Sequence, residues 1–587
     1  MKSEGSSTIK YSLGINLSHD SSAAIVSNSG RVICAVSEER ISRVKNHSGI
    51  PRRSINLLIE NFNESISKII VGSDAGIDMR KARSKISQIS NFPSSKEGEP
   101  YPFPVPGFSS GGGNPKALIE KAIIESSDRL NKNLDFAWIN HHDSHLGQAL
   151  SVSTNIPSLL VSLDGHGDGE SGAVSFKHLN KVTKLARFSD LDSLGELYSA
   201  VTKRYNFKPN HHEGKITGLA AFGNYSRAVD MLQKYVRVSN GSVKIKNIKG
   251  FKKRFLETAL PFRLTKKFST SMDKLISIAE SESDNYADLA YAVQVVLEES
   301  VLEIINYWKN KTNAKGLSLA GGVFANVKLN QRLAEELNFE SVRIFPNMGD
   351  GGISVGGVWS YLSESGLLEK ELMPFDDMFL APPLVNENEE LLAYTNKVNY
   401  RKISKEELPK QIANAIWQGK LVGLHLGKME FGPRALGNRS ILIDPRLENI
   451  NKIANARLKR TEFMPFAPAV LEEEAANWFD FDRIKDLYPF EYMTMTCRVR
   501  SEIQKLIPAV VHLDGTARPQ IVNHRKTPIY WNVLNEFKNL TGVPVVINTS
   551  FNVHEEPINN NLNDSISALQ RNSVDMIFTE FGCFQGE

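Results

Sequence analysis

Cysteine is scarce in this chain of 587 residues, with Cys34, Cys497 and Cys583 lying far apart. This spacing excludes a disulfide framework and a cysteine-based metal site, so we expect a reducing cytoplasm as the location. A charge excess is missing too, because 70 basic side chains stand against 66 acidic ones and give a net charge of +4. That balance gives no argument by itself for nucleic-acid binding.

Long apolar runs are also absent. No apolar run approaches the roughly 18 residues that span a bilayer. The polar start MKSEGSSTIK has no apolar core of a signal peptide. At 41% apolar and 23% charged residues, the composition is typical of a folded protein. We therefore expect a cytosolic globular protein without a membrane partner.

Several catalytic signatures are missing as well. No Gly-Lys pair is followed by Ser or Thr, which excludes a P-loop. The stretch NHHDSHLGQAL (140–150) is not a zincin motif, because His142 stands where that motif has Glu. No nucleophile-elbow serine is evident.

Two similar units organise the first half of the chain. Each consists of a strand, a polar loop containing Asp, a second strand, a turn and a third strand. The predicted strands are 11–17, 22–27 and 31–37 in the first unit, and 158–164, 172–177 and 181–188 in the second. Helical segments follow each unit, for example 284–309. The repeat predicts a duplicated α/β fold with a cleft between two lobes, and such clefts commonly bind nucleotides.

A second α/β domain is expected after a boundary near 374–390. Beyond it, helices at 405–418 and 528–541 alternate with strands at 420–426 and 543–547.

A separate feature is the stretch 91–115, whose proline and glycine density excludes a regular element. A loop of this length is either a lid or substrate-binding loop, or a surface insertion.

Histidines and aspartates suggest a metal site. His141 and His145 are four residues apart, which places both on one face of a helix. This pair is either a chelating pair or a polar patch at a helix start. Asp164 and Asp350 each end an apolar run before glycines. Two imidazoles and two carboxylates together suit Fe(II), Mn(II) or Zn(II).

Glycine-rich stretches point to anion binding. EGKITGLAAFG (213–223), LAGGVFANVKLN (319–330) and GDGGISVGG (349–357) favour backbone amides that cradle phosphates, with Asn326 facing a nucleoside. Arg434, Arg439 and Arg446 lie in a second glycine-rich stretch and offer donors to phosphate or carboxylate, although surface salt bridges would explain them too. Ser550 and Asn552 follow a predicted strand and are expected in a binding loop.

Taken together, these segments resemble the NodU/CmcH family of O-carbamoyltransferases over nearly the whole chain. The motifs that carry the resemblance are SHDSSAAIV, SEERISRVK, HHDSH, LDG, EGKITGLAAFG, GGVFAN, GDGG, EFGPRALGNRSIL, DGTAR and NTSFN.

The resemblance implies two domains. Residues 8–375 would form a duplicated, two-lobed actin/sugar-kinase-like domain, similar to the metal- and nucleotide-binding subunit of the tRNA threonylcarbamoyl transferase. Residues 376–587 would form a YrdC-like α/β domain. The latter would make carbamoyl adenylate from carbamoyl phosphate and ATP with Mg(II), and the former would transfer the carbamoyl group to a hydroxyl of a small molecule or sugar.

The resemblance also implies site residues. His19 would accept the proton of the acceptor, with Asp20 orienting it. The other implied sites are a divalent metal site, most of all for Fe(II), at His141, His145, Asp164 and Asp350; a nucleotide region at Lys215, Gly321, Gly322 and Asn326; and a carbamoyl phosphate and ATP site at Arg434, Arg518, Ser550 and Asn552. His142 is not a ligand in this scheme.

One stretch departs from the family pattern. In RLKRTEFMPFAP (457–468), Met464 stands where an arginine is expected and Leu458 stands near the expected lysine. Lys459 or Arg460 would have to supply the missing charge in the donor site.

Alternatives stay open at this point. One is a nucleic-acid modifier with tRNA as the acceptor, which the near-neutral charge disfavours. Another is a nucleotide-binding protein with a degenerate donor site, and a third is a simple sugar kinase, which the extra C-terminal domain disfavours. The acceptor, the metal and the number of subunits are not determined, with a homodimer as one option.

Overall fold

The computed structural model describes residues 10–72, 115–179, 181–246, 272–368, 375, 377–382, 394, 399–460 and 464–586. The proline- and glycine-rich stretch 91–115 lies outside the described residues apart from its last residue. Among the helices of the described part, none is long and apolar enough to cross a membrane.

The first lobe contains a five-stranded mixed sheet. Its strands are β1 (Tyr11–Asn16), β2 (Ser22–Ser27), β3 (Val32–Ser37), β4 (Ile66–Val71) and β5 (Asp135–Trp138), in the order β3-β2-β1-β4-β5. Strand β2 runs antiparallel to its neighbours β1 and β3, whereas β4 and β5 run parallel to β1. The central strands β1 and β2 are buried along nearly their whole length, as expected where both faces of the sheet are covered, whereas the edge strand β5 is more exposed.

The second lobe repeats this topology. Its strands are β6 (Ser158–Gly167), β7 (Glu170–His178), β8 (Lys181–Ser189), β11 (Gly316–Ala320) and β12 (Ser341–Ile344), in the order β8-β7-β6-β11-β12. Here too the first three strands are antiparallel, and β11 runs parallel to both β6 and β12. The same strand order and the same directions in both sheets confirm the predicted duplication and the actin/sugar-kinase-like arrangement of the two lobes.

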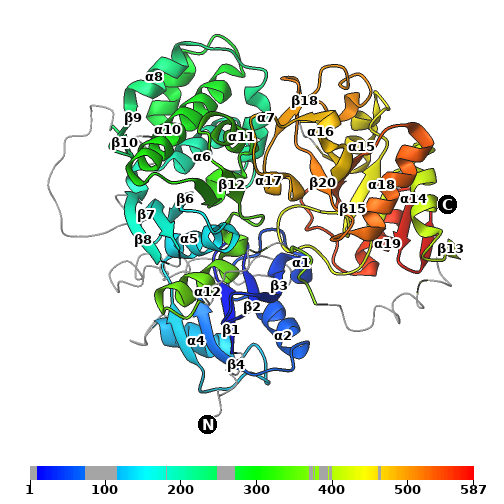
Figure 1. Ribbon diagram of the computed structural model, residues 1–587, viewed down its shortest axis with the longest axis horizontal. Coiled ribbons are helices and arrows are strands. Elements are labelled where there is room, and N and C mark those ends of the chain that lie inside the picture. The colour runs from blue at the N-terminus through cyan, green and yellow to red at the C-terminus, as the bar shows by residue number, and fades with distance from the viewer. Residues whose placement is uncertain are drawn as a thin grey trace.

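Two helices pack between the lobes, α5 (His141–Val152) and α12 (Ile353–Glu364), as Figure 1 shows. Glycine permits their close approach: a Cβ atom on Gly147 would lie 1.9 Å from the carbonyl oxygen of Gly356. Helix α12 also packs against β1 and β2, and α5 packs against β6 and β7. The pair therefore fixes the first turn of α5, with its histidines, at the junction of the two sheets.

Further elements surround the two sheets. They are α1 (Glu38–Ser42), α2 (Arg52–Glu60), α4 (Pro115–Ile124), α6 (Leu194–Arg204), α7 (Glu213–Ala220), α8 (Arg227–Tyr235), β9 (Val236–Ser239), β10 (Ser242–Ile245), α10 (Asp288–Thr312) and α11 (Val327–Glu336). Helix α10 begins four residues later than predicted, at Asp288. The carboxylate of this residue accepts hydrogen bonds from the backbone N–H groups of Asn224 and Asn285 instead of allowing an earlier turn.

The C-terminal part is a separate set of strands. Its eight-stranded mixed sheet has the order β13-β23-β22-β14-β15-β21-β16-β20. The strands are β13 (Asn399–Lys402), β14 (Val422–His425), β15 (Ser440–Ile443), β16 (Ala467–Leu471), β20 (Gln520–Val522), β21 (Val545–Ser550), β22 (Met576–Thr579) and β23 (Gly582–Gln585). A small sheet adds β17 (Phe479–Asp480), β18 (Cys497–Val499) and β19 (Thr516–Ala517). The proposed division at 375 and 376 falls between these strands and those of the two lobes.

The C-terminal helices are α14 (Leu408–Trp417), α15 (Ile450–Arg457), α16 (Ala475–Trp478), α17 (Tyr488–Glu491), α18 (Pro528–Thr541) and α19 (Leu562–Gln570). The predicted helix 528–541 coincides with α18. Polar contacts join this part to the second lobe: Asn330 donates from Nδ2 to the carbonyl oxygen of Thr494 at 2.7 Å, and Arg343 donates from Nε to Asp486 at 2.8 Å.

Candidate functional site

The first turn of α5 presents the two predicted metal-binding histidines. Asn140 caps this helix, because its side-chain oxygen accepts hydrogen bonds from the backbone N–H groups of His142 and Asp143. The backbone N–H of His141 donates to Asp168 at 2.8 Å. With its end fixed in this way, the helix places His141 and His145 one turn apart, and both imidazoles are buried.

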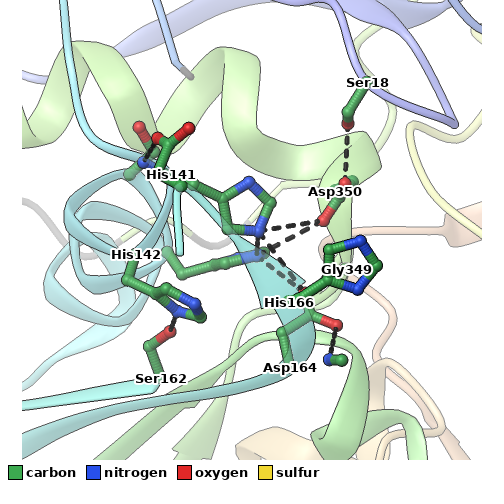
Figure 2. A network of polar contacts seen from close by, with 12 residues as sticks. Ser18, His141, His142, Ser162, Asp164, His166, Gly349 and Asp350 are labelled. Carbon is green, nitrogen blue, oxygen red and sulfur yellow. Dashed lines mark hydrogen bonds and ion pairs between the residues drawn. The ribbon is translucent and has the colours of Figure 1, made fainter. Parts of the chain in front are cut away.

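Asp164 and Asp350 complete the cluster, as Figure 2 shows. His145 Nε2 lies 3.0 Å from Asp164 Oδ2, 3.1 Å from His141 Nε2 and 3.4 Å from Asp350 Oδ1. His141 Nε2 lies 3.7 Å from Asp164 Oδ2 and 3.6 Å from Asp350 Oδ1. Four residues that are distant in sequence thus place one ligand atom each within 4.8 Å of the others.

Each carboxylate is held by the loop in which it lies. Asp164 lies where β6 departs from regular pairing with β7, and its Oδ1 accepts a hydrogen bond from the backbone N–H of Gly165 at 2.6 Å. Asp350 follows β12, and its Oδ2 accepts a hydrogen bond from Ser18 Oγ at 2.6 Å. Each carboxylate therefore turns its other oxygen toward the histidines.

The spacing and the chemistry of the cluster fit a divalent cation. Ligands about 2.0–2.2 Å from one metal ion are separated by about 3.0–3.6 Å when they subtend angles near 90–110°, which is close to the separations in this cluster. Gln148 adds the outer contact expected at such a site: its Oε1 lies 2.6 Å from His145 Nδ1. Donation of the Nδ1 hydrogen to Gln148 leaves the lone pair of His145 Nε2 facing the cluster.

Charge within the cluster controls its protonation. Burial lowers the pKa of His145, but hydrogen bonds and charge from Asp164 and Asp350 outweigh burial and raise this pKa to about 10. Burial raises the pKa of Asp164, and the two histidines bring this pKa well below its ordinary value. The carboxylates therefore hold a proton on the imidazole of His145, and a cation that binds at the cluster would have to displace this proton.

His142 has a different environment from its two neighbours. Its Nδ1 lies 2.7 Å from Ser162 Oγ, and Figure 2 shows its ring turned away from Asp350. Burial, the first cause, and the neighbouring histidines keep its pKa well below the ordinary value. This placement agrees with a neutral packing role, and His142 is outside the group of four ligand atoms.

The predicted proton acceptor lies beside the cluster. His19 Nδ1 lies 3.1 Å from Asp20 Oδ2, and His19 Nε2 lies 3.4 Å from Asp350 Oδ2. The side chain of His19 is 49% exposed, so an acceptor molecule can reach it. Asp350, the largest cause, raises the pKa of His19 to about 10 with help from Asp20, while burial opposes this change. Asn46 fixes Asp20 by donating a hydrogen bond from Nδ2 at 2.6 Å.

The predicted nucleotide residues are only partly gathered at the cluster. A Cβ atom on Gly322 would lie 2.8 Å from Asp164 Oδ1, and one on Gly321 would lie 2.2 Å from the carbonyl oxygen of Leu163. Glycine is therefore required at position 321, where φ is also +101°, whereas a side chain at position 322 would displace the carboxylate of Asp164. Asn326 is engaged elsewhere: it caps α11 by accepting from the N–H of Leu329, and it pairs with Gln294. Lys215 is buried over the ring of Phe207.

The C-terminal candidates gather around Arg460. Its Nη2 donates to Ser550 Oγ at 3.1 Å and to Asn552 Oδ1 at 3.0 Å. Its Nη1 donates to the hydroxyl of Thr549, which the sequence interpretation did not single out although it lies in the NTSFN motif. Lys459 is exposed with a φ of +55°. Of the two residues expected to supply the missing charge, Lys459 and Arg460, the described contacts thus bring Arg460 to the predicted donor site.

Two further polar residues assemble the loops that carry Arg434 and Arg518. Asn548 donates from Nδ2 to the carbonyl oxygen of Ala435 at 3.0 Å and to Gln520 Oε1 at 2.6 Å. Gln520 in turn donates to the carbonyl oxygen of Leu436 at 2.8 Å. The loops 434–436 and 518–520 therefore meet beside β21, which leads to Ser550. Asn548 begins the NTSFN motif and Gln520 lies two residues after the DGTAR motif, but their sequence positions gave no sign of this contact.

Two arginines of the glycine-rich stretch have structural roles. Arg439 is buried and donates to the carbonyl oxygens of Leu426 and Asn560. Arg446 forms an ion pair with Asp444 at 2.7 Å. Leu458 is fully buried in the core, so its position cannot present a charge to a ligand. Arg439 and Arg446 are therefore used within the protein, and an anion-binding role for Arg434 stays a prediction.

Comparison with known sequences identifies relatives along the whole chain. The family profile described as carbamoyltransferase N-terminus matches residues 11–358, and the profile described as carbamoyltransferase C-terminus matches residues 413–584. The nodulation protein NolNO of Sinorhizobium fredii is 30% identical over 95% of this chain and 77% of its own length. An uncharacterized protein of Methanocaldococcus jannaschii is 30% identical over 96% of this chain and 98% of its own length.

A distant similarity appears among solved structures. The crystal structure of HypF from T. kodakarensis is 13% identical, with a TM-score of 0.37, over 63% of this chain and 49% of its own length. A similarity at this level does not bear on function.

Proposed function

This chain belongs to the carbamoyltransferase family, and from that premise we propose that it is an ATP-dependent O-carbamoyltransferase with two active sites. In the C-terminal part, water would cleave carbamoyl phosphate to carbamate and phosphate, and a carbamate oxygen would attack the α-phosphorus of ATP to give carbamoyl adenylate with release of pyrophosphate. In the N-terminal part, a hydroxyl of a small molecule or sugar would take the carbamoyl group and release AMP.

The observation that carries the proposal is the contact between His19 and the cluster. An alcohol is a weak nucleophile near neutral pH, so a base has to remove its proton as it attacks. His19 is exposed to an acceptor, while Asp20 holds its Nδ1 and Asp350 lies next to its Nε2. Base and candidate cation site are therefore close enough to act on one reacting group.

In the transfer step, the acceptor oxygen would form a bond to the carbamoyl carbon. The bond from that carbon to the phosphate oxygen of AMP would break, and the hydroxyl proton would pass to His19. His141, His145, Asp164 and Asp350 would hold a divalent cation, which would supply positive charge for the leaving AMP and for the two carboxylates. With the charge of Asp350 balanced, His19 would lose the main interaction that holds its proton, and it would be free to act as the base.

The donor half-reaction is assigned to the loops that meet at Arg460. This guanidinium is held by Thr549, Ser550 and Asn552, and on binding of the donor it would exchange these contacts for oxygens of the phosphate or the carbamoyl group. Arg434 and Arg518 lie on the adjoining loops. The buried Leu458 leaves the site with less positive charge than the family pattern has, so Arg460 carries more of the binding.

The test separates the two half-reactions. Protein loaded with Fe(II) or Mn(II) is incubated with ATP and carbamoyl phosphate, pyrophosphate is measured, and acceptors are screened by mass spectrometry for the added mass of one carbamoyl group. Arg460→Ala is expected to stop pyrophosphate release, whereas His19→Ala is expected to retain it and to lose transfer. If both variants fail in the same half-reaction, the assignment of the two sites is wrong.

A second candidate function is a nucleotide-binding protein without turnover. The observation that favours it is the loss of two expected cations, since Leu458 is buried and Met464 cannot bind phosphate. Tight ATP binding in a protein that releases no pyrophosphate would support this function over catalysis.

A further inference from the structure

The proposed chemistry leaves unexplained the SEER motif, which forms helix α1 at the junction of the first lobe and the C-terminal part (Figure 1). Two arginines in and beside α1 contact the C-terminal part. Arg43 donates to the carbonyl oxygens of Ile558 at 2.8 Å and Pro557 at 3.0 Å, and its Nε lies 3.3 Å from Asp564. Every nitrogen of the Arg43 guanidinium thus has a partner, as expected of a structural contact.

Arg40 differs from Arg43 in its partners. It is only 1% exposed, and its Nη2 donates to the carbonyl oxygen of Gly432 at 2.5 Å. Its Nε and Nη1 have no hydrogen-bond partner, and Nε lies 3.7 Å from the carboxylate of Glu39. Burying charged donors without partners is unfavourable, and replacement by an apolar side chain of similar size is often neutral or stabilising. Arg40 therefore calls for an explanation other than stability.

Two more buried side chains beside Gly432 have an unpartnered atom. They are Asn347, through the donor Nδ2, and Glu430, through the acceptor Oε2. A Cβ atom built on Gly432 would lie 3.3 Å from the Cβ of Asn347, and Glu430 precedes Gly432 by two residues. Donors and an acceptor that lack partners are thus gathered around the segment 430–432. We call Arg40, Asn347, Glu430 and Gly432 the seam.

The seam lies between the two proposed active sites. On one side, the carbonyl oxygen of Asn347 accepts from Gln148 Nε2 at 3.1 Å, and Gln148 also contacts His145 of the cluster. On the other side, Glu430 Oε1 accepts from the backbone N–H groups of the loop 436–439, which follows Arg434. A molecule that moves from the donor site to the cluster would meet the seam.

We propose that the seam is a gate through which carbamoyl adenylate passes, and that Arg40 binds its phosphate during the passage. The inference rests on the proposed function. The complementarity is chemical: the phosphate accepts from the guanidinium, the carbamoyl oxygen accepts from Asn347, and the carbamoyl amino group donates to Glu430. The unpartnered atoms contact no solvent in this closed arrangement, so the seam has to widen for the passage. No bond is made or broken there.

The test compares Arg40→Met with the matched control Arg43→Met. Both changes remove a guanidinium that contacts backbone carbonyls across the same junction. Three quantities are measured: pyrophosphate released in the first turnover, the melting temperature, and arrival at the cluster. Arrival of carbamoyl adenylate is measured without an acceptor. Mn(II) bound at the cluster speeds the relaxation of water protons, and this effect falls when a molecule reaches the cluster after ATP and carbamoyl phosphate are added.

Arg40→Met is expected to release pyrophosphate like the wild type and to keep or raise the melting temperature, but to slow arrival by about tenfold or more, since it loses a charge-assisted contact. Arg43→Met is expected to lower the melting temperature and leave arrival unchanged. Equal arrival rates in Arg40→Met and the wild type would overturn the gate, as would pyrophosphate release by the wild type without any arrival signal. A wild type that releases no pyrophosphate refutes the proposed function itself.

Discussion

Gln148 offers the sharpest test of the cluster, because nothing in its type marks it as a functional residue. Its Oε1 lies 2.6 Å from His145 Nδ1, and its Nε2 donates to the carbonyl oxygens of Asn347 and Gly349. Gln148→Leu keeps a similar volume and removes the acceptor that orients His145. Outer contacts of this kind are worth about 10–100-fold in metal affinity, or about 1.4–2.8 kcal/mol at tenfold per 1.4 kcal/mol.

The assay is a competition titration of metal-free protein with Mn(II), Zn(II) and Fe(II) against a chelator of known affinity. The matched control is Ser144→Ala on the same turn of α5, whose hydroxyl bonds only to the backbone oxygen of Asn140 among the described contacts. Its metal affinity should stay within about threefold of the wild type, well under the loss expected for an outer contact. Equal affinities for Gln148→Leu and the wild type, or equal losses in both variants, would show that Gln148 does not support a metal ligand.

Four further predictions follow from the same structure. His141→Ala should abolish stoichiometric metal binding while His142→Ala retains it; titration of both variants checks this, and the opposite pattern would overturn the ligand assignment. Because the carboxylates raise the pKa of His145 to about 10, metal binding near pH 7 should release a proton, and affinity should rise with pH by about tenfold per unit below that pKa; calorimetry in buffers of different ionisation enthalpy would expose an absence of proton release. Gly147→Ala should destabilise the protein by about 1–3 kcal/mol through a clash with α12, whereas Gly214→Ala, which meets nothing within 4 Å, should be neutral or stabilise by up to about 1 kcal/mol; equal denaturation midpoints would contradict this packing. Asp20→Asn should slow transfer more than pyrophosphate release, because it removes the charge beside His19; an equal effect on both would place Asp20 outside the transfer site.

Periodicity and turn residues were sufficient to predict the duplicated lobes. The pattern of three antiparallel strands repeats in sequence at β1–β3 and β6–β8, and each copy contains its own turn. Such local signals do not depend on distant residues. The start of α10 was predicted too early, because the residues before it bond to the side chain of Asp288, a contact that is partly long-range.

The site was predictable where residue type and spacing act together. The four-residue spacing of His141 and His145 is a property of one helix, but the approach of Asp164 and Asp350 depends on two separate strands and was suggested by their positions before glycines. The roles of Arg40 and Arg439 arise from partners far away in sequence, and Gln148 joins His145 on its own helix to the distant Asn347 and Gly349. Arg439 shows the limit well: an arginine among glycines is typical of an anion site, yet this one donates to backbone carbonyls.

Formation of carbamoyl adenylate is the first step of the proposed reaction, and exchange of labelled pyrophosphate into ATP measures that step most directly without any acceptor. We predict exchange that requires carbamoyl phosphate, persists in His19→Ala and disappears in Arg460→Ala. ADP as the nucleotide product, or exchange that is independent of carbamoyl phosphate, would contradict formation of carbamoyl adenylate from carbamoyl phosphate.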